Sequence, residues 1–296
     1  MAEAASHASQ RRPLRSRRRS RPLLRVSPFV LLLAAFVVVA LIPQLLAPHD
    51  PNATDLALRL RAPGFRAGGQ TYWLGTDSLG RDQLSRVLWG ARVSLVVSVA
   101  AVLAAGVIGS ALGIMAGYFG GWLGAVVMRA ADLVLSIPFF LLAILTVVVL
   151  GPSLLNLIIV LGLVRWPRYA RVAFGQTLDT KNRDFVQASR AIGAGSFRLI
   201  TRHIVPDVLP ALIVVATLEV GLMILYEAAL SFIGLGVQPP TASWGSMLAE
   251  GQKYVESAWW LATFPGLALF LVVVSVNLIG DFARDLLDPK ERSLRT

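Results

Sequence analysis

Long runs of apolar residues alternate with short polar segments along most of this chain of 296 residues. A helix that crosses a bilayer needs about 20 mostly apolar residues, and this length scale leads us to assign six runs as membrane-spanning helices. They lie at 27–47, 93–118, 130–150, 154–166, 208–232 and 261–282. The fourth is short because Arg165 and Pro167 interrupt it. The pattern predicts an all-α, polytopic membrane protein with six transmembrane helices.

Glycine and proline residues inside these runs predict how the helices pack and bend. Gly109, Gly113 and Gly117 make two successive GxxxG steps, with Gly106 one turn earlier, so another helix can approach that face closely. In the third run, Pro138 removes a backbone hydrogen bond and is expected to kink the helix. We interpret the glycines as packing positions.

A polar, basic segment at residues 184–206 separates the fourth and fifth runs. Helical spacing of i, i+3, i+4 and i+7 gives its first half one mildly apolar face, formed by Phe185, Ala188, Ser189 and Ile192. Gly193 is expected to end this helix in a left-handed conformation, and Ser196 to cap the next one. The second helix is expected to align Phe197, Ile200 and Ile204. The segment therefore predicts a helix–turn–helix at the membrane surface, with a shape suited to docking a partner.

Composition and charge distribution support the membrane assignment and orient the chain. It is 55% hydrophobic and 15% charged, with a mean hydropathy of +0.66 and a net charge of +11. Eight arginines oppose one glutamate in the first 25 residues, beside the first run. The positive-inside rule and attraction to anionic lipid explain this tail better than nucleic-acid binding does. Because Ala47-Pro48 is a poor cleavage site, we expect the first run to be retained. Six spans then place both termini in the cytoplasm.

The loops agree with this orientation, with one exception. The inner loop 167–207 carries seven basic and three acidic residues, as expected for a cytoplasmic segment. The first outer loop conflicts with the rule because its arginines exceed its acidic residues. These arginines are Arg59, Arg61, Arg66, Arg81, Arg86 and Arg92.

Sequence motifs for catalysis are missing. The chain has no GxxxxGK[ST] phosphate loop, no HExxH and no GxSxG. It has no cysteine, and His7, His49 and His203 lack the spacing of metal ligands. We therefore predict that the chain is not an enzyme and that it has no cofactor or metal of its own. Any energy for transport has to come from separate subunits.

Ionisable residues inside membrane spans are costly and are candidate functional residues. Arg129 and Asp132 stand three apart and are expected to pair on one helix face. Glu219 and Glu227 have no obvious local partner and lie about 80° apart around an ideal helix. We interpret both as candidates for the translocation path. For Glu227 a structural role in the turn that follows remains an alternative.

The segment at 184–206 resembles the EAA loop of permease subunits of ABC importers. The pattern places Gln187, Ala188 and Ser189 where the family has Glu-Ala-Ala, followed by Gly193 and Pro206 at the family's spacing. The family's Ile and Leu near the end are His203 and Val205 here. Three further strings resemble the dipeptide, oligopeptide and nickel importer permeases. They are LGTDSLGRDQLSRVLWGARVSL at Leu74–Leu95, EAALSFIGLGVQPPTASWGSM at Glu227–Met247 and IGDFARDLLDP at Ile279–Pro289.

This resemblance implies a permease subunit that works with a second homologous permease, two ABC ATPase subunits and an extracytoplasmic substrate-binding protein in a prokaryotic cell membrane. ATP would be bound by the partner subunits. Dipeptides or oligopeptides are the expected substrates, with nickel, opines, glutathione or another small solute as alternatives. An ATPase-independent channel is the rival of another class, although it leaves the EAA-like loop unexplained.

The resemblance also assigns regions and residues. The expected regions are a basic cytoplasmic tail at 1–26, the first transmembrane helix and outer loop at 27–92, a five-helix permease core at 93–289 with its coupling loop at 167–207, and a cytoplasmic end at 290–296. The expected ATPase-coupling residues are Gln187, Ala188, Ser189, Ala191, Gly193, Ala194, Ser196, Arg202 and Pro206.

Overall fold

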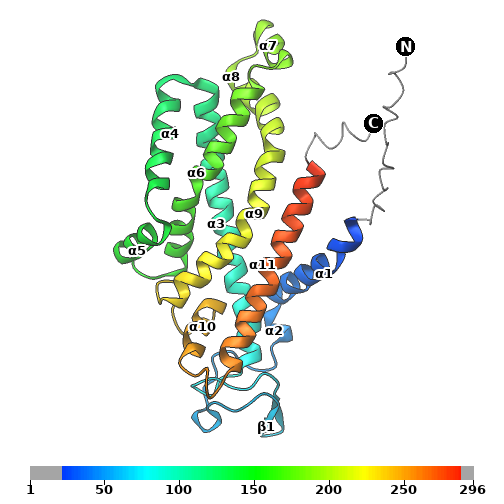
Figure 1. Cartoon of the computed structure of the whole chain (residues 1–296), viewed down its shortest axis with the longest axis vertical. Helices are drawn as coiled ribbons and strands as arrows, with labels where there is room; N and C mark the ends of the chain where they lie inside the picture. Colours follow the sequence, from blue (N-terminus) through cyan, green and yellow to red (C-terminus); the bar gives the residue numbers. More distant parts are fainter. Residues whose placement is uncertain (1–21, 288–296) are drawn as a thin grey trace, which may run out of the picture.

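The computed structural model describes residues 22–287, and the side chains of residues 27–284 within that range. The side chains of the basic tail expected at 1–26, and the segment expected at 290–296, lie outside the described residues. Helices make up most of the described part of the chain (Figure 1). They are α1 Pro22–Leu41, α2 Pro43–Leu46, α3 Gln83–Phe119, α4 Gly121–Ser136, α5 Phe139–Leu150, α6 Leu154–Thr180, α7 Asp184–Ala191, α8 Ser196–Leu199, α9 Val205–Phe232, α10 Trp244–Gln252 and α11 Trp260–Leu287.

The long helices α3, α6, α9 and α11 run along the long axis of the molecule (Figure 1). The short helices α7 and α8 lie at one end, whereas α10 and a two-stranded hairpin lie at the other. The hairpin pairs β1 (Phe65–Ala67) with β2 (Gln70–Tyr72) in antiparallel register. Two short helical turns complete the described chain: a 3₁₀ turn at Leu56–Leu58 and a π-helix at Ile200–Ile204. The all-α fold expected from the sequence is confirmed.

Length and hydropathy support part of the expected span count. Three continuous helices within residues 27–284 are long and apolar enough to cross a membrane: Gln83–Phe119, Ser196–Phe232 and Trp260–Arg284. The bent pair α4 and α5 would make a fourth span, and Ser27–Leu41 is a shorter apolar helix. The helix α6 is longer than expected, because it continues through Arg165 and Pro167 to Thr180. Six spans are therefore not established by these criteria.

The third apolar run is broken rather than kinked. The helices α4 and α5 meet at an angle of 95° around Ile137 and Pro138, so the sequence located the position of the bend but not its size. The segment expected as an inner loop at 119–129 is mostly helical, since the chain turns at Gly120 and Gly121, with φ of 63° and 55°, and enters α4 directly.

The expected glycine groove lies on α3 and faces α6. A Cβ atom built on Gly109 or Gly113 would overlap the backbone carbonyl groups of Trp166 and Ala170. The helices can therefore approach closely only because these positions carry no side chain. Their role in packing is confirmed, and α3 with α6 forms the centre of the largest core cluster.

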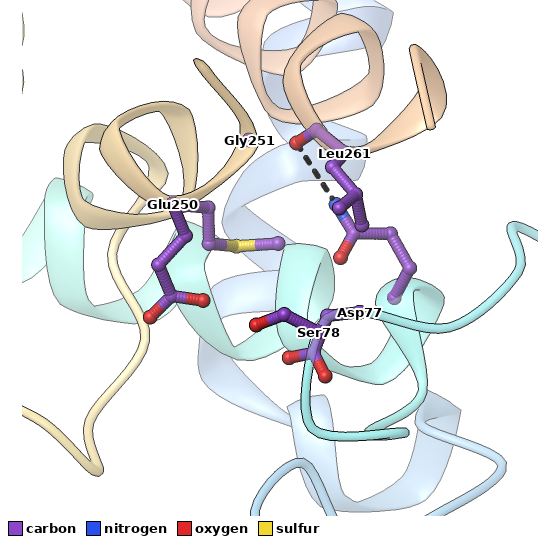
Figure 2. Close-up of a pocket in the computed structure, with 7 residues that line it drawn as sticks. Asp77, Ser78, Glu250, Gly251 and Leu261 are labelled. Carbon is purple, nitrogen blue, oxygen red and sulfur yellow. Dashed lines mark hydrogen bonds between the residues drawn. The ribbon is translucent and has the colours of Figure 1, made fainter. Parts of the chain in front are cut away.

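Charged side chains at the opposite end from α7 hold a folded cap together. Arg81 contacts Asp77 at 2.6 Å and Glu250 of α10 at 2.9 Å, and Arg86 contacts Glu250 at 3.2 Å. Asp77 and Glu250 line a small cavity of about 10 Å³. Both side chains are labelled in Figure 2, where the dashed line marks the hydrogen bond that Gln83 donates to the carbonyl of Leu261. Two arginines that conflict with the positive-inside rule are thus neutralised within the cap.

Candidate functional site

A sharp turn joins α7 and α8 at the end of the molecule (Figure 1). Gly193 has φ +89°, which confirms the left-handed conformation expected from the sequence. No heavy atom lies within 4 Å of a Cβ built on this residue. The requirement for glycine is therefore conformational and does not come from crowding.

The expected cap of the second helix is wrong. Ser196 is the first residue of α8, and Gly195 occupies the N-cap position with no side-chain hydrogen bond to the helix. The extended backbone of Gly195, with φ −68° and ψ 157°, moves the start of the helix one residue earlier than the sequence pattern suggests. The Ser196 side chain is consequently exposed and not used locally.

Two large apolar side chains stand out from the turn. Ile192 is 87% exposed and Phe197 is 82% exposed, whereas Val186 and Leu199 are buried beneath them. We name Ile192 and Phe197 the apolar tip. The sequence placed both on apolar helix faces, but it could not show that these faces lack a partner within the chain. An exposed apolar group between arginine-bearing helices is a typical protein-docking feature.

The predicted coupling residues other than Gly193 and Ser196 lie in α7, in the turn that follows it, in the π-helix or at the start of α9. Gln187 donates to the carbonyl of Lys181 at 2.9 Å, and the Ser189 hydroxyl lies 3.3 Å from His203 Nε2. Most of the remaining predicted residues are exposed, and Ala194 is half-buried. They are Ala188, Ala191, Ala194, Arg202 and Pro206. The predicted residues thus lie on one continuous stretch that runs from α7 through α8 to the start of α9.

Polar contacts fix the base of this segment. Asp207 accepts hydrogen bonds from Thr180 at 2.5 Å and from Arg183 at 3.1 Å. Arg183 also contacts Asp179 at 2.8 Å, and this hydrogen bond raises the pKa of Arg183 above its ordinary value. Lys181 donates to the carbonyl of Gly117 at 2.7 Å. These bonds join the ends of α3, α6 and α9 to α7.

The segment Ser196–Phe232 forms one continuous helical rod of 37 residues. It includes α8, the π-helix at Ile200–Ile204 and α9. A π-helical turn inserts one extra residue into the helical repeat without ending the helix. A displacement of Phe197 can therefore be passed directly along α9, because no loop separates the two within Ser196–Phe232.

A cluster of charges surrounds the buried Glu219, halfway along α9. Glu219 has no exposed surface, and its carboxylate accepts from Arg165 of α6 at 2.7 and 2.8 Å. Arg168 Nε contacts the same carboxylate at 2.9 Å. The guanidinium of Arg165 stacks over the ring of Tyr226 at 5.5 Å, and Tyr226 stacks on Phe139 of α5. Glu219 thus has partners that its own helix does not supply.

Glu227, the second acidic candidate on α9, has different hydrogen-bond partners from Glu219. It is also fully buried, and it accepts a hydrogen bond from Ser231 at 2.8 Å. The Ser231 hydroxyl in turn accepts from the backbone N–H of Val237 at 3.2 Å. This chain of bonds connects the end of α9 to the turn that follows, as the structural alternative for Glu227 requires.

The expected pair of Arg129 and Asp132 does not form. Asp132 contacts Arg171 of α6 at 2.5 Å, because α4 packs along α6 and brings the two side chains together. Within residues 27–284, no group of three or more His, Asp or Glu side chains is placed to hold a metal ion.

Comparison with known proteins gives concordant results. The family described as binding-protein-dependent transport system inner membrane component matches residues 109–293. The chain is 44% identical over 272 residues to a probable D,D-dipeptide transport system permease protein of Escherichia coli (strain K12), which covers 90% of both chains. It is 43% identical over 262 residues to a di/tripeptide transport system permease protein of Pseudomonas aeruginosa, covering 88% of this chain and 86% of the relative.

Other relatives carry different names. The nickel transport system permease protein of Escherichia coli (strain K12) is 41% identical over 260 residues, covering 88% of this chain and 92% of the relative. Among solved structures, an inward-facing form of the MetNI methionine ABC transporter matches with a TM-score of 0.54 and 21% identity. It covers 69% of this chain and 96% of that chain.

Proposed function

This chain belongs to the family of binding-protein-dependent transport system inner membrane components, and on that premise we propose that it is the permease subunit of an importer for dipeptides or oligopeptides. The general role, a multi-pass ABC importer permease, follows from the family and the relatives. The peptide substrate is supported by two relatives named for dipeptide or di/tripeptide transport. Relatives named for nickel and glutathione keep those solutes as alternatives.

The observation that supports the coupling mechanism is the exposed side chain of Phe197 on a continuous helical rod that is long and apolar enough to cross a membrane. We propose that each of two ATPase subunits docks on one permease, and that this chain supplies one docking site through α7 and α8. ATP would be bound by those subunits. Closure of the ATPases would move the apolar tip, and the continuous helix from Ser196 to Phe232 would transmit the motion to Glu219.

We propose the remaining partners and the regions on the same basis. A second, homologous permease would complete the pathway, and an extracytoplasmic binding protein would deliver the substrate to the outer cap. Residues 27–92 would form the first helix and outer loop, and residues 93–289 the permease core. Since α6 continues to Thr180, the coupling segment within 167–207 would begin only after that helix. The termini would lie in the cytoplasm of a prokaryotic cell.

Labelling of single cysteines tests both this orientation and the docking site. The chain has no cysteine, and both Ser196 and Ser257 are exposed, on α8 and after α10 respectively. In intact cells, an impermeant maleimide is expected to label Ser257→Cys and not Ser196→Cys. In inside-out vesicles Ser196→Cys should react, and bound ATPase subunits should slow that reaction at least tenfold without altering any reaction of Ser257→Cys.

Two outcomes would count against the proposal. Labelling of Ser196→Cys in intact cells would reverse the orientation. Equal labelling rates of Ser196→Cys in vesicles with and without ATPase subunits would remove α8 from the docking surface.

A further inference from the structure

The charge cluster on α6 and α9 contains more positive than negative charge. Two guanidinium groups, Arg165 and Arg168, contact the single carboxylate of Glu219. The ion pair between Arg171 of α6 and Asp132 of α4 is balanced and leaves this excess unchanged. Among the side chains at 27–284, Glu219 is the one acidic group within ion-pair distance of Arg165 or Arg168. The cluster therefore carries a net charge of about +1.

Glu219 belongs to Ser196–Phe232, one of the three helical segments that are long and apolar enough to cross a membrane. Glu219 is the fifteenth of the 28 residues of α9, which places it about 20 Å from either end of that helix. An unbalanced charge at such a depth is costly unless it faces a polar cavity or meets an anion. Irregular backbone at membrane depth is likewise tolerated where it is buried in protein or lines a cavity. The break between α4 and α5 is next to the cluster, through the stacking of Phe139 on Tyr226.

The two arginine side chains differ in exposed fraction. This difference indicates which of them carries the positive charge that Glu219 does not balance. The Arg165 side chain is 14% exposed and makes two hydrogen bonds with Glu219. The Arg168 side chain is 55% exposed while its Nε stays within 2.9 Å of the same carboxylate. Arg165 and Glu219 thus form a closed, neutral pair. Arg168 is held by Glu219 at one edge and remains accessible at the other.

We propose that Arg168, positioned by Glu219, binds the carboxylate of the substrate as it crosses the membrane. This inference rests on the proposed function and narrows its substrate class. A planar guanidinium suits a carboxylate because it offers two parallel N–H donors. Peptides and other carboxylate-bearing solutes satisfy the excess charge, whereas a free divalent cation is repelled by it. The cluster therefore favours a carboxylate-bearing substrate over nickel ion.

The test uses the complete transporter in proteoliposomes, with its second permease, ATPases and binding protein. Uptake is measured for one dipeptide with a free carboxyl group and for its C-terminal amide, chosen so that wild type takes up both. Arg168→Gln leaves the neutral pair of Arg165 and Glu219 in place, so the protein is expected to fold. Arg168→Lys retains the charge. Arg66→Gln, at an exposed arginine of the outer hairpin, is the matched control.

We expect Arg168→Gln to reduce ATP-dependent uptake of the free acid by about tenfold, which is the scale of one charge-assisted hydrogen bond. Uptake of the amide should change less than twofold, Arg168→Lys should recover part of the loss, and Arg66→Gln should resemble wild type. Equal loss of uptake for both peptides would overturn the inference. Loss of the second permease when Arg168→Gln is purified would also overturn it, and would indicate that Arg168 pairs with an acidic residue of that partner. Unchanged uptake in Arg168→Gln would overturn it too. Wild-type uptake of nickel ion but of neither peptide would instead overturn the proposed peptide function together with this inference.

Discussion

Glu219→Gln is expected to lower the stability of the folded chain by about 3–5 kcal/mol, the typical cost of removing one member of a buried ion pair. The amide keeps the size of the side chain but leaves Arg165 and Arg168 of α6 without a counter-charge. Heating of the detergent-solubilised complex, followed by size-exclusion chromatography, measures the effect as a lower temperature of loss of the monodisperse peak.

The matched control is Asp132→Asn, which removes the partner of Arg171. Both members of that pair are about half exposed, so its loss is expected to cost no more than about 1 kcal/mol. If the two variants lost stability to the same extent, Glu219 would not be the buried centre of a charge cluster.

Phe197→Asp is expected to reduce co-purification of the ATPase subunits by tenfold or more. Burial of a phenylalanine side chain in an interface contributes about 1.5–3 kcal/mol, and an aspartate in its place would bring an unpaired charge into that interface. Because Phe197 is 82% exposed, the substitution should leave the folding of this chain unchanged. Quantitative pull-down from membranes, normalised to the amount of permease, is the measurement.

Val255→Asp serves as the control for this substitution. Val255 is 52% exposed and follows α10 at the opposite end of the molecule. ATPase recovery should therefore be the same as in wild type. Equal recovery from Phe197→Asp and wild type would mean that the apolar tip is not an ATPase contact.

Local sequence patterns predicted much of the fold and of the coupling segment. The apolar runs located the long helices, and Gly193 marked the turn between α7 and α8 because only a positive φ is needed there. The GxxxG steps located the contact of α3 with α6. Each of these properties depends on residues within a few positions of one another, so a single sequence contains the information.

Contacts between distant residues explain what the sequence could not predict. Glu219 meets Arg165 across 54 positions, and Arg81 meets Glu250 across 169. The sequence indicated an end of the fourth run at Arg165 and Pro167, whereas α6 continues and brings both Arg165 and Arg168 to Glu219. The exposure of the apolar tip could not be predicted either, because an apolar helix face has the same sequence pattern whether it packs on the core of its own chain or binds a partner.

The central claim is that this chain is an importer permease coupled to ATPase subunits through α7 and α8. Whether substrate accumulation depends on ATP tests that claim most directly. The complete transporter is reconstituted with the binding protein and a labelled dipeptide outside the vesicle, and ATP or a non-hydrolysable analogue inside. An importer permease coupled through α7 and α8 should accumulate the dipeptide above its outside concentration with ATP and show no net uptake with the analogue. Dipeptide flux that stops at equal concentrations and proceeds equally well without nucleotide would contradict the account and identify a channel.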